Sequence, residues 1–120
     1  MAENELTHAI IGTSCDVLNE LGPGFHEKPY ENALAIELGI RRLPFDQQKR
    51  YPVLYKSIQV GEYVPDLIVG GAVIVDAKVI ERITDLERGQ MLNYLRITKL
   101  HVGLIINFRK PKLEWERIVL

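Results

Sequence analysis

Apolar side chains in the first forty residues follow the spacing of two helices. Over residues 4–21 they recur at intervals of three and four, which predicts an amphipathic helix that ends at Gly22-Pro23-Gly24. A second helix is predicted from about Glu27 to Leu38, where Gly39 follows. Pro29 is compatible with this helix because it falls in the first turn, where its missing N–H is not needed.

The centre of the chain is rich in β-branched and aromatic residues, which is typical of strands. Residues 45–79 are predicted to form three successive strands, with turns near Lys56-Ser57 and at Gly70-Gly71. The second turn joins two runs, Tyr63 to Val69 and Ala72 to Val79, into an antiparallel hairpin.

The last third of the chain adds one helix and two strands. The segment Thr84-x-x-Glu87 has the spacing of a capping box and opens a helix that runs to about Lys99. Strands are predicted from His101 to Phe108 and from Leu113 to Val119. The resulting order, ααβββαββ, predicts a single α/β domain over residues 1–120, with a mixed β-sheet flanked by helices.

Charged residues interrupt the predicted hairpin where an ordinary buried strand would carry only apolar ones. Asp66 precedes the glycine turn, and Asp76 and Lys78 end the apolar run that follows it. Because side chains alternate along a strand, Asp76 and Lys78 share one face. Buried charge is costly unless it is paired or bound to a metal, so these three groups are candidates for one site.

The length of the hairpin loop decides whether the two aspartates meet. A two-residue loop at the glycine pair aligns Val69 with Ala72 and turns Asp66 and Asp76 to opposite faces. A three-residue loop aligns Val69 with Val73 and brings the two aspartates directly opposite each other. Glycine suits both kinds of loop, so the sequence leaves the two alternatives open.

If the aspartates face each other, a further group must balance their charge. Two unit charges about 4 Å apart at an effective dielectric of about 20 repel by about 4 kcal/mol. A cross-strand contact contributes only roughly 0.2–1 kcal/mol. A cation between the carboxylates, or a proton on one of them, is therefore needed. Lys78 offsets part of the charge, and oxygen ligands of this kind favour Mg²⁺ or Mn²⁺.

Polar residues also fall on the apolar faces of two predicted helices. Glu27 shares the face of Tyr30 in the second helix, and Glu31, one step round, is an alternative functional acid. Gln90 and Tyr94 are four residues apart within the apolar arc of the last helix, so their polar ends reach one neighbourhood. Each also has an ordinary explanation, a helix-start acid for Glu27 and a core tyrosine for Tyr94.

Composition limits the function classes. The content of 47% hydrophobic and 26% charged residues is that of a globular protein. The net charge of −1 weighs against nucleic-acid binding through a general basic excess, so basic residues that bind nucleic acid would have to be concentrated locally. The single cysteine, Cys15, excludes an internal disulfide. No apolar run spans a membrane and the N-terminus lacks a basic signal region, so we expect a cytoplasmic protein.

Four short motifs in order resemble those of a known family. The segment Gly24-Phe-His-Glu27-Lys-Pro-Tyr30 matches the signature of the GxxExxY proteins, a family placed in the PD-(D/E)XK nuclease superfamily. Val64-Pro-Asp66 resembles the PD element of that superfamily and Asp76-Ala-Lys78 its (D/E)xK element. Gln90-Met-Leu-Asn-Tyr94 is similar to the QxxxY motif of its exonuclease-like branch. The family more often has Glu where this chain has Asp76.

The resemblance implies a restriction-endonuclease-like core and a set of residue roles. Asp66 and Asp76 would ligate Mg²⁺ or Mn²⁺ together with the backbone carbonyl of Ala77, and Glu27 would complete the acidic site. Lys78 would position or activate the attacking water. The motif residues Gln90 and Tyr94 would orient the substrate or the lysine.

The function implied is metal-dependent hydrolysis of phosphodiester bonds in DNA or RNA. The competing hypothesis is a non-catalytic binding or assembly module that keeps the nuclease fold. Near-neutral charge and small size favour this alternative, because such a chain offers little surface to hold a polymer. A homodimer would remove the objection by joining two sites.

Overall fold

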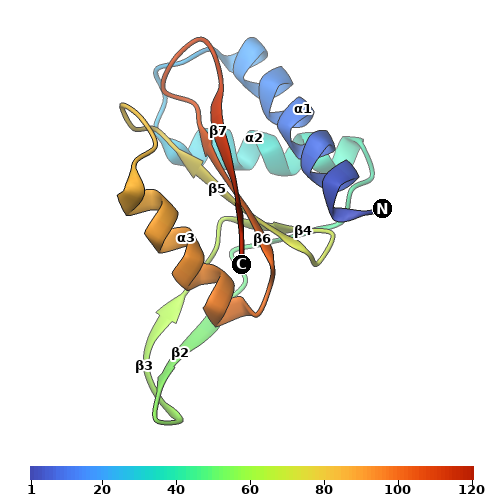
Figure 1. Cartoon of the computed structure of the whole chain (residues 1–120). Helices are drawn as coiled ribbons and strands as arrows, with labels where there is room; N and C mark the ends of the chain where they lie inside the picture. The colour runs from blue at the N-terminus through green and yellow to red at the C-terminus, as the bar shows by residue number, and fades with distance from the viewer.

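A computed structural model describes residues 1–120 (Figure 1). The elements are, in chain order, α1 (Glu3–Leu21), α2 (Glu27–Ile40), β1 (Phe45–Gln47), β2 (Tyr51–Tyr55), β3 (Ile58–Tyr63), β4 (Leu67–Val69), β5 (Val73–Lys78), α3 (Asp85–Thr98), β6 (Val102–Asn107) and β7 (Glu114–Val119). The helices, the last two strands and both predicted turns lie where the sequence places them. No helix is long and apolar enough to cross a membrane.

Five of the strands form one mixed sheet in the order β1-β4-β5-β6-β7. Strands β5 and β6 are parallel, and the other neighbours are antiparallel. A parallel pair needs a crossover connection, and α3 supplies it between β5 and β6. The predicted fold class, a mixed sheet flanked by helices with a restriction-endonuclease-like core, is therefore confirmed.

The prediction of only three strands between residues 45 and 79 is wrong, because the structure has five. The run from Tyr63 to Val69 is not one strand: β3 ends at Tyr63 and β4 begins at Leu67. Pro65 lies between them, and proline cannot donate a hydrogen bond to a sheet ladder. β2 and β3 pair only with each other, and Figure 1 shows this ribbon extending away from the five-stranded sheet.

Alternation along β5 assigns its side chains to two helical layers. Val73, Val75 and Ala77 belong to the larger core cluster, which includes side chains of α1 and α2. Ile74 belongs to a smaller cluster with Met91 of α3. By the same alternation, the side chains of Asp76 and Lys78 lie on the α3 face of the sheet.

The hairpin between β4 and β5 has the three-residue loop. Val69 pairs with Val73 and Leu67 with Val75, so Asp66 is in register with Asp76. Gly70 has φ +62°, and a Cβ built on it would lie 2.8 Å from Cδ2 of Leu6 in α1. Of the two loops that the sequence left open, the structure contains the one that brings the aspartates together.

The start of α3 has the predicted capping box. Thr84 accepts a hydrogen bond from the N–H of Leu86 at 3.3 Å, and the Glu87 carboxylate accepts one from the N–H of Thr84 at 2.7 Å. The helix ends at Thr98, and Lys99 takes the left-handed conformation with φ +61°. Local signals at both ends therefore fix the element that carries Gln90 and Tyr94.

Replacing Gly103 with alanine is expected to destabilise the protein by about 1–3 kcal/mol. A Cβ at this position of β6 would lie 2.8 Å from Cγ of Met91 and would also overlap its sulfur, so the fully buried Met91 and α3 would have to shift. Urea unfolding measures the loss. Gly89→Ala is the control: its Cβ meets no atom within 4 Å, and alanine in a helix stabilises by roughly 0.5–1 kcal/mol. Equal effects of the two changes would contradict this packing.

Candidate active site

The chain brings residues from five places to one pocket on the α3 face of the sheet: α2, β3, the turn before β4, β5 and α3. Asp66 comes from the turn before β4, and Asp76 and Lys78 come from the end of β5. Tyr63 ends β3, and Tyr94 lies in the middle of α3. A cavity of about 260 Å³, which we name the carboxylate pocket, is lined by Glu27, Tyr63, Val64, Asp66, Asp76, Ala77, Lys78 and Tyr94.

The two aspartates face each other in a poorly hydrated setting. One Asp66 carboxylate oxygen accepts a hydrogen bond from the N–H of Ala77 at 2.9 Å. Burial, followed by the charge of Asp76, raises the pKa of Asp66 to about 7. Burial also raises the pKa of Asp76 to about 6, although Lys78 acts in the opposite direction. Both carboxyl groups therefore hold protons at pH values where an ordinary aspartate is ionised.

A third acid, Glu31, lies behind the pair. It is 3% exposed, and its Oε2 atom accepts hydrogen bonds from Gln47 at 2.7 Å, Gln48 at 2.8 Å and Lys28 at 3.0 Å. Burial acts to raise the pKa of Glu31, but these three hydrogen bonds together lower it below its usual value. The negative charge of Glu31 in turn helps to raise the pKa of Asp66, so the acid that the sequence offered as an alternative to Glu27 belongs to this cluster.

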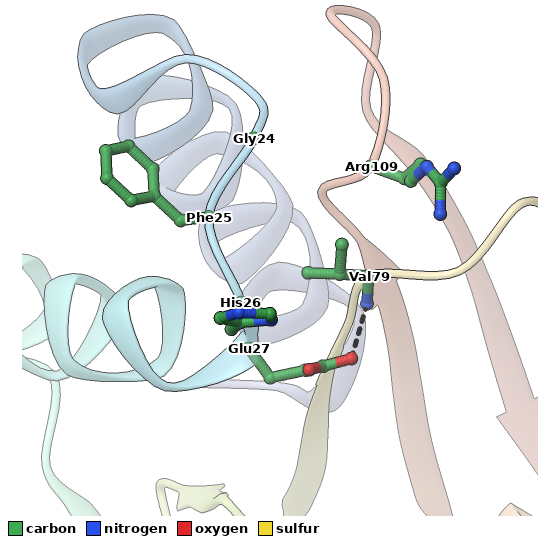
Figure 2. A pocket seen from close by; sticks show the side chains of 6 residues that line it. All are labelled: Gly24, Phe25, His26, Glu27, Val79 and Arg109. Carbon is green, nitrogen blue, oxygen red and sulfur yellow. Dashed lines mark hydrogen bonds between the residues drawn. The ribbon is translucent and has the colours of Figure 1, made fainter.

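Glu27 lines the same pocket from the first residue of α2. Its Oε2 atom accepts a hydrogen bond from the N–H of Val79 at 2.9 Å, which ties the start of α2 to the end of β5 (Figure 2). The side chain also lines a second cavity on its other side. Glu27 is thus placed at the edge of the carboxylate pocket, while Glu31 lies behind the aspartates.

Two stacked tyrosines form another wall of the pocket. The rings of Tyr63 and Tyr94 are 3.9 Å apart at their centroids with an interplanar angle of 11°. Burial and the charges of Asp76 and Asp66 raise the pKa of Tyr94. Gln90 is half-buried one turn earlier in α3 and is not among the residues that line the pocket. The structure therefore brings Tyr94, but not Gln90, to the aspartates.

Sequence reasoning did not identify Tyr63 or the two glutamines as part of the site. The hydroxyl group of Tyr63 is buried and has no hydrogen-bond partner in the protein. Gln47 and Gln48 are sixteen and seventeen residues from the Glu31 that they contact, so no local pattern connects them. The proline after Tyr63 was the one available signal that the chain turns toward the aspartates here.

The residues of the pocket suit a hard divalent cation, although the structure contains no preassembled group of three His, Cys, Asp or Glu ligands. The donors are carboxylate oxygens, which Mg²⁺ and Mn²⁺ prefer. Burial is the main cause of the raised pKa values of Asp66 and Asp76, so a bound cation would stabilise their ionised forms. The unpartnered hydroxyl of Tyr63 adds a polar group that can interact with a bound species, since leaving it unpaired costs about 1–3 kcal/mol.

The contribution of Asp66 and Asp76 to stability without metal is expected to fall as the pH rises from about 4 to about 7. In this range these two carboxyl groups bind more protons in the folded chain than in the unfolded chain, because folding raises the pKa values of Asp66 and Asp76 above that of an ordinary aspartate. Asp66→Asn should flatten this dependence and stabilise the protein at pH 7.5 by at least about 1 kcal/mol. Thermal unfolding at several pH values in EDTA measures both effects. The exposed Asp46→Asn is the control, and an unchanged pH slope in Asp66→Asn would contradict the assignment.

The mixed sheet, the paired aspartates and the lysine on the same strand face define an α/β protein with a restriction-endonuclease-like fold. The family model of the PD-(D/E)XK nuclease superfamily matches residues 4–118, and the chain belongs to that superfamily. Nucleases of this superfamily generally use divalent metal ions and act on nucleic acids. No match was found among curated protein sequences or solved structures.

Proposed function

We propose that this chain, as a single domain over residues 1–120, is a divalent-metal-dependent nuclease that hydrolyses phosphodiester bonds of DNA or RNA. One observation carries the proposal: Asp66, Asp76 and Lys78 converge on one pocket. Asp66 lies before β4, and the β4–β5 turn separates it in sequence from Asp76 and Lys78. Nearby burial and charge hold both aspartates far from their ordinary pKa values, which is typical of functional sites.

Asp66 and Asp76 are the proposed ligands of Mg²⁺ or Mn²⁺, with the carbonyl of Ala77 as a further oxygen. Glu27 completes the set from the edge of the pocket, and Glu31 is the acid that holds negative charge behind it. A cation bound there would lower the pKa of a water molecule and polarise a phosphate oxygen.

Lys78 and Tyr63 are proposed to act on the substrate and the water inside the pocket, whereas Gln90 lies outside the residues that line it. Lys78 lies on the same strand face as Asp76, so its ammonium group can orient the attacking water and offset charge on the phosphate. The Tyr63 hydroxyl is free to donate a hydrogen bond into the pocket. Tyr94 and Gln90 of α3 are the proposed orienting residues, Tyr94 at the pocket wall and Gln90 one turn away.

We further propose that the chain is a GxxExxY protein, since the motif has a clear structural use. Gly24 has φ +116°, a conformation that favours glycine. The Tyr30 hydroxyl donates a hydrogen bond to the carbonyl of Gly22 at 2.6 Å and accepts one from the N–H of Phe25 at 3.3 Å. These contacts fix the loop before α2 and so present Glu27 to the pocket.

The test is a cleavage assay on labelled single- and double-stranded DNA and RNA with Mg²⁺, with Mn²⁺ and with EDTA. Cleavage that needs the metal and disappears in Asp76→Asn supports the proposal. Binding without cleavage of any substrate in either metal would instead favour a non-catalytic binding or assembly module. Sedimentation analysis at the assay concentration tests whether the working form is a homodimer.

A further inference from the structure

A second cavity lies next to the carboxylate pocket, and the two share one side chain. This cavity, which we name the Arg109 cavity, has a volume of about 350 Å³ and is lined by Gly24, Phe25, His26, Glu27, Val79 and Arg109. Figure 2 shows Arg109 and His26 on different sides of this cavity, with Glu27 below His26. The Glu27 carboxylate accepts a hydrogen bond from the N–H of Val79. Since Glu27 lines both cavities, a ligand in one lies a single side chain away from the other.

Backbone hydrogen bonds fix Arg109 relative to the proposed catalytic lysine. The N–H of Phe108 donates to the carbonyl of Lys78 at 2.9 Å, and Arg109 is the next residue. The N–H of Arg109 donates to Oδ1 of Asn107 at 3.2 Å, and the N–H of Ile80 donates to the same atom at 3.1 Å. The segment that carries Arg109 is therefore attached directly to the end of β5.

The connection between β6 and β7 is basic although the whole chain is not. It contains three basic residues, Arg109, Lys110 and Lys112, and no acidic one, whereas the net charge of the chain is −1. The guanidinium group of Arg109 is exposed and makes no ion pair or side-chain hydrogen bond within the protein. Lys110 and Lys112, in the same connection between β6 and β7, likewise form no ion pair.

We propose that the Arg109 cavity binds a phosphate group of the nucleic acid, one that neighbours the phosphate held in the carboxylate pocket. This inference rests on the proposed function. The planar guanidinium of Arg109 offers paired donors that match phosphate oxygens, and His26 adds a ring N–H across the cavity. The Glu27 carboxylate lies between the two cavities and already accepts a hydrogen bond from the N–H of Val79. This hydrogen bond offsets part of the repulsion between Glu27 and a bound anion.

A strand that crosses both cavities accounts for their arrangement. Phosphates recur once per nucleotide along a strand, so a substrate held over Asp76 and Lys78 must place its next phosphate beside the pocket. The Arg109 cavity is the neighbouring space that carries an unpaired cation. The phosphate it holds is either an internal diester or a terminal monoester, and both have the same recognition chemistry.

Binding without turnover tests the inference. Fluorescence anisotropy in EDTA would follow labelled oligothymidylate and oligouridylate of roughly 12 nucleotides on wild type and Arg109→Ala. We expect Arg109→Ala to weaken binding on the order of tenfold and to reduce the slope of log K against log salt by about 0.7. Arg42→Ala is the matched control. Arg42 follows the far end of α2, about 20 Å from Glu27 by the rise of the helix, and should change affinity less than about twofold.

Short competitors with and without a 5′-phosphate then identify the kind of phosphate. If the 5′-phosphate raises the affinity of the competitor for wild type but not for Arg109→Ala, the cavity binds a terminal monoester. If competitors with and without the 5′-phosphate compete equally for wild type, the cavity binds an internal diester. Arg109→Ala that behaves like Arg42→Ala would overturn the inference even if the protein cleaves nucleic acid. A loss of oligonucleotide affinity in Arg109→Ala that Arg42→Ala does not share would uphold the inference even if no cleavage is found. Wild type that binds neither oligonucleotide would overturn it together with the proposed substrate.

Discussion

Replacing Lys78 with alanine is expected to lower metal-dependent phosphodiester cleavage by about 10²–10³-fold while leaving the fold intact. Lys78 is the single lysine among the residues that line the carboxylate pocket, and it lies at the half-buried end of β5. Its removal takes away the cation that faces Asp76 and the proposed position of the attacking water. Single-turnover cleavage with saturating protein measures the loss in the chemical step, separately from binding.

Two further variants distinguish a specific role of Lys78 from a general loss of positive charge. Lys56→Ala removes an exposed lysine at the tip of the β2–β3 ribbon and should keep cleavage within about threefold of wild type. Lys78→Arg keeps the charge but changes the geometry of the donors, and should recover only part of the activity. If Lys78→Ala and Lys56→Ala lose activity equally, Lys78 has no catalytic role.

Phe108→Ala is expected to reduce the free energy of unfolding by about 3–5 kcal/mol. The Phe108 ring is fully buried and stacks on Tyr30, with centroids 4.6 Å apart and an interplanar angle of 6°. Tyr30 in turn holds the loop before α2 through its hydroxyl group. Because natural domains are stable by only about 5–15 kcal/mol, the variant should show much earlier denaturant unfolding.

A second aromatic residue next to Tyr30 gives the control for this prediction. Phe25 also contacts Tyr30, with centroids 6.0 Å apart, but it is 46% exposed. Phe25→Ala should therefore cost less than about 1.5 kcal/mol. Equal destabilisation by Phe108→Ala and Phe25→Ala would mean that the buried stack does not carry the stability assigned to it.

Much of the fold could be predicted because its signals are local. The capping box at Thr84 and the glycines after α1 mark helix ends without reference to the rest of the chain. The separate β2–β3 ribbon was missed because its residues have ordinary strand composition. What separates the ribbon from the sheet is that β1, rather than β3, pairs with β4, and this choice depends on tertiary packing.

The sequence singled out several residues that line the carboxylate pocket, among them Asp66, Asp76 and Lys78, but it did not determine how they are arranged. Both loop lengths at Gly70-Gly71 satisfy the local rules, so the sequence could not decide whether Asp66 meets Asp76. Long-range contacts accompany the observed loop: the N–H of Gly70 donates to the carbonyl of Pro44 at 2.7 Å, and Leu6 packs against the same glycine. The hydrogen bonds between Glu31 and the glutamines are likewise products of the folded chain.

The most direct test of the proposed metal site is a calorimetric titration of chelator-stripped protein with Mn²⁺ and Mg²⁺, alone and with an added oligonucleotide. Wild type and Asp76→Ala are compared under the same conditions. If the carboxylate pocket is a metal-dependent nuclease site, wild type will bind the ion, at least with nucleic acid present, and Asp76→Ala will not. Absence of binding to wild type even with the oligonucleotide, or equal binding by Asp76→Ala, would contradict it.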